Sequence, residues 1–205
     1  MIPQRFVTEY PQRCGHLLEM LEPKAREANL VGSFSLLIAS AAFTIPFARI
    51  TESNHPFGGK ERKLSSAIRN LTNVSFLEAP FWGEQKPVLF RYARIVNSAK
   101  IAGDWKDSAG AHPICSTENK DGNTVLRTIR NALAHGNVVY LDENGRESAD
   151  SPLRYLAFIS KHDDKVSFRV AIFGEEDFLI FLKAWIAWLR TFPSESAFVF
   201  LEAAE

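Results

Sequence analysis

Apolar positions in the first quarter of the chain recur at helical spacing. Between Glu9 and Ala28 they follow one side of a helix, and between Leu30 and Ala42 they occur on nearly every side. The second pattern is typical of a helix surrounded by other helices, and Pro46 marks its expected end. The chain is therefore expected to begin with an amphipathic helix followed by a buried one.

The middle of the chain carries weaker patterns. Residues 51–59 contain a proline and a pair of glycines, which predicts a loop, and residues 103–122 form a second, polar loop. Helices are predicted over 60–77 and over 88–100. A turn between these two helices is marked by Pro80, Gly83 and Pro87.

A short capped helix is predicted next, ending at His135. Asp121 or Asn123 is a suitable N-terminal cap, and Gly136 is a suitable stop. The inner side of this helix is apolar because three aliphatic residues recur at helical spacing, namely Leu126, Ile129 and Leu133.

After Gly136 the spacing of apolar residues changes from the period of a helix to that of a strand. Three segments rich in β-branched and aromatic residues are separated by clusters of turn residues, and they are Val138–Leu141, Leu153–Ser160 and Val166–Phe173. They predict a small antiparallel β-ribbon over about 137–173. A final helix then begins with three acidic residues at 175–177, carries Trp185 and Trp188, and ends before Pro193. The fold class is mainly α, a helical bundle with the ribbon placed before the final helix.

Composition and charge narrow the class of protein. The 205 residues, 46% of them apolar, predict a single globular domain over 1–205. The formal net charge is zero, which excludes a strongly basic coat for nucleic acid but allows a local basic patch. Two cysteines do not form a disulfide framework, so a cytoplasmic location is expected. The uncharged stretch from Asn29 to Ala48 reaches membrane-spanning length, but its small and polar residues favour a core helix and no membrane partner.

Common catalytic and metal motifs are absent from the sequence. Gly58-Gly59-Lys60 lacks the remaining residues of a phosphate loop, and no Gly-x-Ser-x-Gly elbow occurs. Cys14-Gly15-His16 and His112-Pro113-Ile114-Cys115 lack the spacing of a zinc site. We therefore expect neither a metal nor a cofactor.

The segment from Arg127 to Asn137 carries the candidate chemistry. Arg127, Asn131 and His135 are successive i, i+4 neighbours and form one polar stripe, which the long side chain of Arg130 can also reach. His135 lies in the last helical turn, where the helix dipole favours the protonated ring. This setting suits a residue that accepts and returns a proton. A polar helix edge closed by a capping histidine explains the same pattern without any function.

Arg130-Asn131-x-x-x-His135 resembles the R-x(4–6)-H signature of the HEPN superfamily, in the form that has Asn after Arg and ends in Ala-His-Gly. The ribbon and final helix are similar to a bacterial subset of that superfamily, as is the segment Ala42–Arg49. The resemblance implies a helical bundle that dimerises and brings two motif helices over a shared cleft. It also implies a polar or acidic site residue from an earlier helix, for which Ser33, Ser35 and Glu78 are candidates.

Many HEPN proteins are metal-independent ribonucleases of toxin–antitoxin, phage-defence or RNA-processing systems. The resemblance therefore implies an endoribonuclease in which Arg130 and His135 are catalytic and Asn131 supports them. Arg127 and Asn137 would contact RNA. An antitoxin or a nucleotidyltransferase is a further implied partner.

Two other classes of function remain open at this point. One is a catalytically silent HEPN module that binds RNA, a nucleotide or a protein. The other is an assembly domain, which the tryptophan-rich final helix favours.

Overall fold

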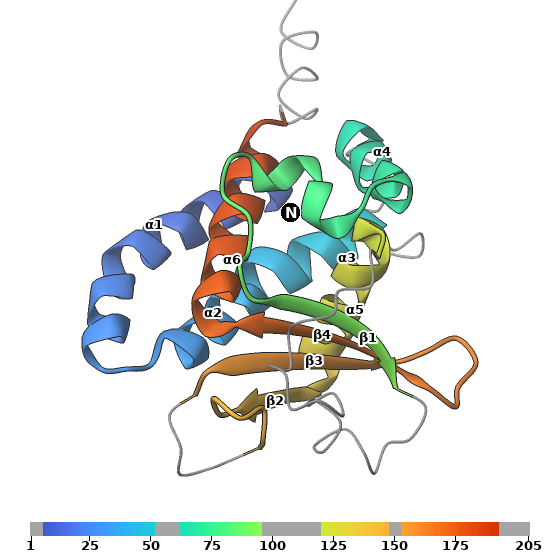
Figure 1. The fold of residues 1–205 in the computed structure, drawn as a ribbon. Helices are drawn as coiled ribbons and strands as arrows, with labels where there is room; N and C mark the ends of the chain where they lie inside the picture. The colour runs from blue at the N-terminus through green and yellow to red at the C-terminus, as the bar shows by residue number, and fades with distance from the viewer. Residues whose placement is uncertain (1–5, 52–61, 96–119, 148–152, 193–205) are drawn as a thin grey trace, which may run out of the picture.

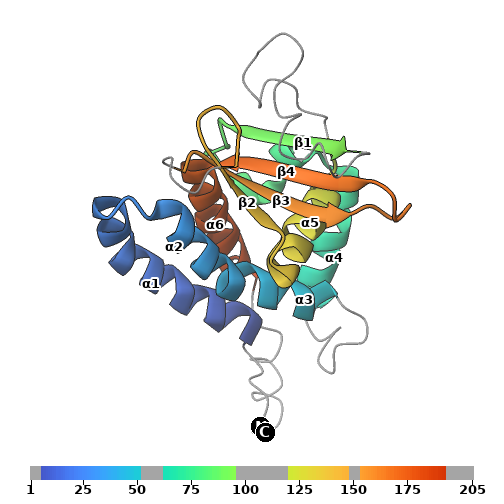
Figure 2. The same cartoon turned by 90° about the horizontal axis from the view of Figure 1, so that it is seen from below.

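In the computed structural model, helices cover one face of a four-stranded antiparallel sheet (Figures 1 and 2). The structure describes residues 6–51, 62–95, 120–147 and 153–192. The loops predicted at 51–59 and 103–122 fall almost wholly outside these residues, as does the helix stop at Pro193. The four strands are β1 (Phe90–Ile95), β2 (Val138–Leu141), β3 (Tyr155–Lys161) and β4 (Phe168–Gly174). They lie in the order β1-β4-β3-β2, so β4 and β3 are in the middle.

The first helices confirm the amphipathic and buried patterns. Helix α1 spans Phe6–Glu27 and α2 spans Val31–Ala39. The predicted end at Pro46 is wrong, because a π-helical turn at Ser40–Thr44 leads directly into α3, Ile45–Thr51. Pro46 thus lies in the first turn of α3, where a proline needs no N–H partner, and the wider π turn precedes it.

The stretch from Val31 to Thr51 is long and apolar enough to cross a membrane by length and composition alone. Half of its most apolar window is buried inside the fold, and α2 packs against the last helix, α6, Glu175–Arg190. Core helices meet the same criteria. The interpretation as a core helix therefore fits the packing.

The helix predicted over 60–77 is shorter than expected. Helix α4 spans Arg62–Asn70, and 3₁₀ turns follow at Leu71–Asn73, Phe76–Glu78 and Pro80–Trp82. The chain leaves the helix because its backbone pairs elsewhere: the Val74 carbonyl accepts from Gly122, and the Phe76 amide donates to the Lys120 carbonyl. Tertiary pairing thus replaces helical hydrogen bonds in this segment.

The helix predicted over 88–100 is wrong, because this segment supplies β1, Phe90–Ile95. Phe90 and Tyr92 are buried on the helix-facing side, and Arg91 between them points to the other face. This alternation has period two, the period of a strand. β1 pairs with β4 along its whole length.

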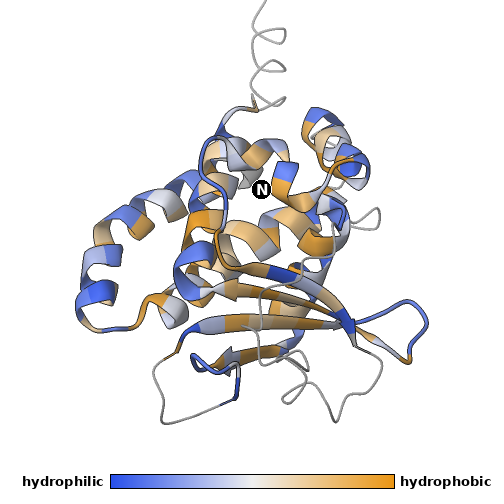
Figure 3. Cartoon of the chain, in the orientation of Figure 1, coloured by the Kyte–Doolittle hydropathy of each residue, from blue (hydrophilic) through white to orange (hydrophobic). Residues whose placement is uncertain are grey.

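The rest of the chain confirms the predicted order. Helix α5 spans Gly122–His135 and α6 spans Glu175–Arg190. The ribbon consists of β2, β3 and β4, which are Val138–Leu141, Tyr155–Lys161 and Phe168–Gly174. The fold is therefore mainly α with the small sheet before the last helix. Figure 3 shows that the hairpin joining β3 to β4 is mostly polar.

The core between helices and sheet is unusually aromatic, and α6 lies within it. Phe181 is fully buried and contacts rings from the π turn, the 3₁₀ turns, β4 and its own helix. Trp185 is also fully buried, and its indole N–H donates to the Ala42 carbonyl at 3.2 Å. The tryptophan-rich helix is therefore buried in this fold.

Asp177 fastens the edge strand to the last helix. Its buried carboxylate accepts the backbone N–H groups of Val88 at 2.6 Å and Leu89 at 3.2 Å. These residues lead into β1, so one side chain connects the start of β1 to the first turn of α6.

Replacing Asp177 by alanine is expected to lower the free energy of unfolding by about 2–3 kcal/mol, because two buried amides lose a charged acceptor. Urea denaturation measures this change. Asp177→Asn retains one carbonyl oxygen as an acceptor, so its free energy of unfolding should fall by less than that of Asp177→Ala. A loss below about 0.5 kcal/mol in Asp177→Ala, the level of an ordinary surface change, would show that the β1 connection is unimportant.

Candidate functional site

Helix α5 is held at both ends by short-range contacts. Asp121 caps the N-terminus by accepting the Thr124 amide at 2.8 Å. At the other end Gly136 is left-handed, with φ +69°, and the Asn137 amide donates to the Ala132 carbonyl at 2.8 Å. These contacts are the Schellman type of helix end that favours glycine. The predicted caps at Asp121 and Gly136 are confirmed.

The inner side of α5 anchors it in the core. Val125, Leu126, Ile129 and Ala132 are fully buried, and Leu133 packs against the same cluster. The helix packs against β3 and contacts the π turn. Its opposite side is consequently fixed in orientation and turned outward.

The outward side carries the residues singled out from the sequence. Arg127, His135 and Asn137 are exposed, and Arg130 and Asn131 are partly buried. Arg130 donates from Nη1 to the Asn131 amide oxygen at 3.0 Å. We call the five residues Arg127, Arg130, Asn131, Ala134 and His135 the motif face, because they share one side of the helix.

The motif face supplies a cation, an amide and an imidazole, with the imidazole at the carbonyl end of the helix. A guanidinium binds phosphate oxygens through paired N–H groups, and an imidazole can exchange a proton. Both side chains are reachable from solvent, so a polymeric substrate can approach them without opening the core.

The three candidates for an additional site residue differ in their surroundings. Ser35 is buried, and its hydroxyl donates to the Val31 carbonyl at 2.7 Å. Ser33 and Glu78 are exposed on α2 and on a 3₁₀ turn. No hydrogen bond joins any of them to the motif face within the described residues, so the earlier-helix residue remains unassigned.

Cys14 belongs to the core rather than to a metal centre. It is buried on α1, and burial raises the pKa of its thiol. In the part of the chain that the structure describes, no group of three or more His, Cys, Asp or Glu side chains is placed to hold a metal ion. His112 and Cys115 lie outside that part. The expectation of no metal and no cofactor stays a prediction.

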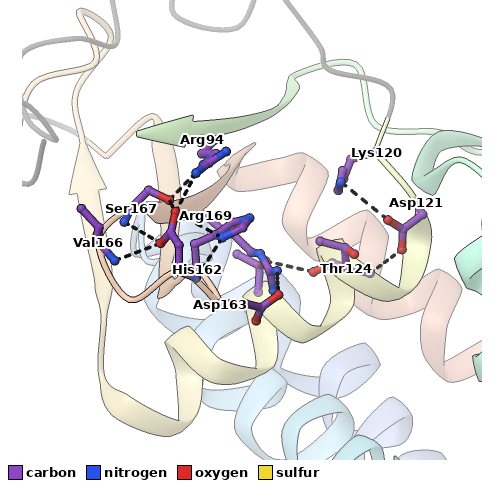
Figure 4. Close-up of polar contacts among 11 residues, drawn as sticks. Arg94, Lys120, Asp121, Thr124, His162, Asp163, Val166, Ser167 and Arg169 are labelled. Atoms are coloured by element: carbon purple, nitrogen blue, oxygen red, sulfur yellow. Dashed lines mark hydrogen bonds and ion pairs between the residues drawn. The ribbon is translucent and has the colours of Figure 1, made fainter. Parts of the chain in front are cut away.

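A polar cluster that the sequence analysis missed lies at the β3–β4 hairpin (Figure 4). Asp164 accepts from the Ser167 hydroxyl at 2.6 Å, from the Ser167 and Val166 amides at 2.9 Å, and from Arg94 at 2.6 Å. Arg169 pairs with Asp163. Arg169 lies in a segment predicted as a strand, but Arg94 lies in the segment predicted to be helical, so no signal in the sequence indicated that the two would meet.

The hydrogen bonds to Asp164 hold the turn of the β3–β4 hairpin. Hydrogen bonds from the Ser167 hydroxyl, then from the Ser167 and Val166 amides, hold the pKa of the Asp164 carboxyl well below its usual range. Because the pKa is depressed in the folded state, the contribution of the Asp164 carboxylate to stability is fully present above the ordinary carboxyl pKa. It is lost as the pH falls from there through the depressed pKa.

Asp164→Ala is therefore expected to speed amide hydrogen exchange at Val166 and Ser167 at pH 7, because both amides lose their acceptor. Residue-resolved exchange measured by NMR tests this. Asp163→Ala is the matched control, since Asp163 accepts from no backbone amide among the described residues. Unchanged exchange in Asp164→Ala, or equal acceleration in both variants, would contradict the assignment.

The mainly α fold with a small sheet before the last helix is consistent with a HEPN-like domain. The chain belongs to the HEPN family described as HEPN pEK499 p136, whose sequence model matches residues 1–196. No curated protein and no solved structure matches the chain. The family supports a general role as a HEPN nuclease or RNA-binding module.

Proposed function

We propose that the protein is a metal-independent endoribonuclease whose active site is the motif face of α5. One observation carries the proposal: Arg130, Asn131 and His135 share the outward side of a helix whose other side is fixed in the core. The role as a toxin, a phage-defence factor or an RNA-processing enzyme belongs to the same proposal.

The chemistry uses groups that these residues carry. The 2′-hydroxyl oxygen attacks the adjacent phosphorus as His135 accepts the hydroxyl proton. The new O2′–P bond forms, the P–O5′ bond breaks, and the departing 5′-oxygen takes a proton from an imidazolium. Arg130 stabilises the charge that develops on the phosphate oxygens. Asn131 holds the Arg130 guanidinium, and Arg127 and Asn137 contact the RNA backbone.

This mechanism needs the 2′-hydroxyl, so it separates RNA from DNA. The experiment compares a fluorescent RNA oligonucleotide with its DNA counterpart in buffer containing excess EDTA. Cleavage of RNA alone supports the proposal. Cleavage of both, or of neither by folded protein, overturns it, and binding of RNA without cleavage would identify the silent HEPN module instead.

Two further partners belong to the proposal. We propose that the chain acts as a homodimer, since six large apolar side chains are exposed on α1, α2, α3 and their connection: Leu17, Met20, Leu21, Leu30, Leu37 and Ile45. Surfaces of this kind are commonly buried in assemblies. An antitoxin or a nucleotidyltransferase is the other proposed partner. Light scattering gives the assembly state, and a molar mass equal to that of one 23.1 kDa chain would contradict the dimer.

A further inference from the structure

The helix-facing side of the sheet becomes polar at its hairpin end. The strand register places Arg94 opposite Arg169, and Arg169 opposite Ser160. Directly opposed residues of antiparallel strands point to the same face. The adjacent row on that face is apolar and belongs to the core under the helices, since it consists of Tyr92, Ala171 and Phe158. We call Arg94, Arg169 and Ser160 the polar row.

The polar row reaches β3 next to a residue that is hydrogen-bonded to the chain just after α5, at the end of the helix that carries His135. Ser160 follows Ile159, whose amide donates to the Asn137 carbonyl at 3.0 Å, just beyond the helix stop. Ser160 is 5% exposed, and its hydroxyl has no hydrogen-bond partner within the described residues. The Ser160 hydroxyl is thus a buried polar group directly opposite Arg169, next to the apolar row of the same face.

Arg169 is carried by a strand that packs against α5. Thr124, Thr128, Asn131 and His135 are spaced by four, three and four residues, so they follow one line along the helix. Helix α5 packs against β4. Figure 4 shows the pair of Arg169 and Asp163 at the β3–β4 hairpin. The strand that carries Arg169 therefore packs against the helix whose polar line ends at the proposed catalytic histidine.

The two ion pairs of the polar row differ in how firmly the acid is held. Asp164, the partner of Arg94, also accepts two backbone amides and a hydroxyl. Asp163 contacts only Arg169 within the described residues, and its side chain is 83% exposed, whereas that of Arg169 is 17% exposed. Exposed ion pairs of this kind contribute little stability. The Asp163 carboxylate can consequently leave while the guanidinium keeps its position.

We propose that Arg169 binds an RNA phosphate next to the motif face and that Asp163 occupies it in the free protein. The inference rests on the proposed function, because it extends the substrate path of that site. A phosphate offers the guanidinium a pair of anionic oxygens, as a carboxylate does. The neighbouring phosphates of the RNA chain add further negative charge. Asp163 thus competes with the substrate and limits its affinity.

The test measures RNA affinity by fluorescence anisotropy, using the full chain and a fluorescein-labelled 20-nucleotide oligouridylate. All proteins carry His135→Ala so that the probe stays intact. Asp163→Asn is expected to raise the affinity by about two- to fivefold, the range for breaking an exposed ion pair. Glu143→Gln is the matched control: it removes one exposed acid from the turn after β2, at the other end of the sheet, and should change the affinity less than twofold.

Arg169 is tested by salt dependence. Arg169→Gln should lower the affinity and reduce the slope of log K against log salt concentration by about 0.7, the value for one phosphate contact on a single strand. Arg169→Lys should retain the slope because it retains the charge. In the Arg169→Gln background, Asp163→Asn should have no further effect, since the two residues act through one contact.

The outcomes separate this inference from the function on which it rests. RNA binding that is unchanged by both Asp163→Asn and Arg169→Gln overturns the inference and leaves the proposed nuclease intact. Loss of binding in Arg169→Gln together with loss of its circular dichroism spectrum shows a folding defect, and Asp163→Asn then decides alone. Absence of RNA binding by every protein, with no cleavage by the unmodified chain, overturns both.

Discussion

Replacing His135 by alanine is expected to lower the rate of RNA cleavage by about 10²- to 10⁴-fold, the usual contribution of a positioned acid–base group. The imidazole is exposed at the end of α5, so its removal leaves the buried side of the helix unchanged. Arg130→Ala should lower the rate by about 10²- to 10³-fold, because it removes a charge that stabilises the transition state.

Single-turnover cleavage of a labelled RNA in EDTA measures both effects. His16→Ala is the matched control, since His16 is an exposed histidine on α1, outside the motif face. The thermal unfolding midpoints of all variants should differ by no more than an ordinary surface substitution causes. Equal rates for His135→Ala and the unmodified chain would exclude His135 from the chemistry.

Replacing Trp185 by alanine is expected to have the largest effect on stability, a loss of about 3–5 kcal/mol in the free energy of unfolding. The indole is fully buried, and its ring centre lies 5.2 Å from that of Phe43 and 5.3 Å from that of Trp188. Its hydrogen bond to Ala42 also ties α6 to the π turn between α2 and α3. Truncation would leave a cavity between these elements and remove the hydrogen bond to Ala42.

Urea denaturation at equilibrium gives the change for Trp185→Ala. Val166→Ala is the control, because Val166 is 69% exposed on the hairpin and should change stability by less than about 0.5 kcal/mol. A loss below about 1 kcal/mol for Trp185→Ala would mean that the aromatic cluster is not the centre of the core.

Helix α5 and the ribbon were predictable because their signals are local. A capping aspartate, an apolar side and a stop glycine define α5 within a few residues. The ribbon strands are short, rich in β-branched and aromatic residues, and separated by turn sequences. Their predicted bounds differ from the observed ones by at most two residues.

The errors occur where distant contacts decide the local structure. Phe90–Ile95 becomes a strand because it pairs with β4, nearly eighty positions away along the chain, and because Asp177 fastens its start. Pro46 continues the helical path because a π turn precedes it, and a π turn has no reliable signature in a single sequence. The helix at 60–77 is cut short by backbone pairing with the segment before α5.

The residues of the candidate site also differ in whether local or distant contacts bring them together. The motif face follows from helical spacing alone, so Arg130, Asn131 and His135 could be grouped in advance. The polar row could not, because it depends on the register of three strands. Arg94 and Arg169 are far apart in sequence and are brought together only by the pairing of β1 with β4.

The most direct test of the account is the identity of the new 3′ ends after RNA is incubated with the unmodified protein in excess EDTA. Attack by the 2′-hydroxyl predicts 2′,3′-cyclic phosphate ends, detected by mass spectrometry of the fragments. It also predicts that these ends disappear in Arg130→Ala and His135→Ala. Ends carrying a free 3′-hydroxyl, or cyclic ends that persist in both variants, would contradict the assignment of catalysis to the motif face.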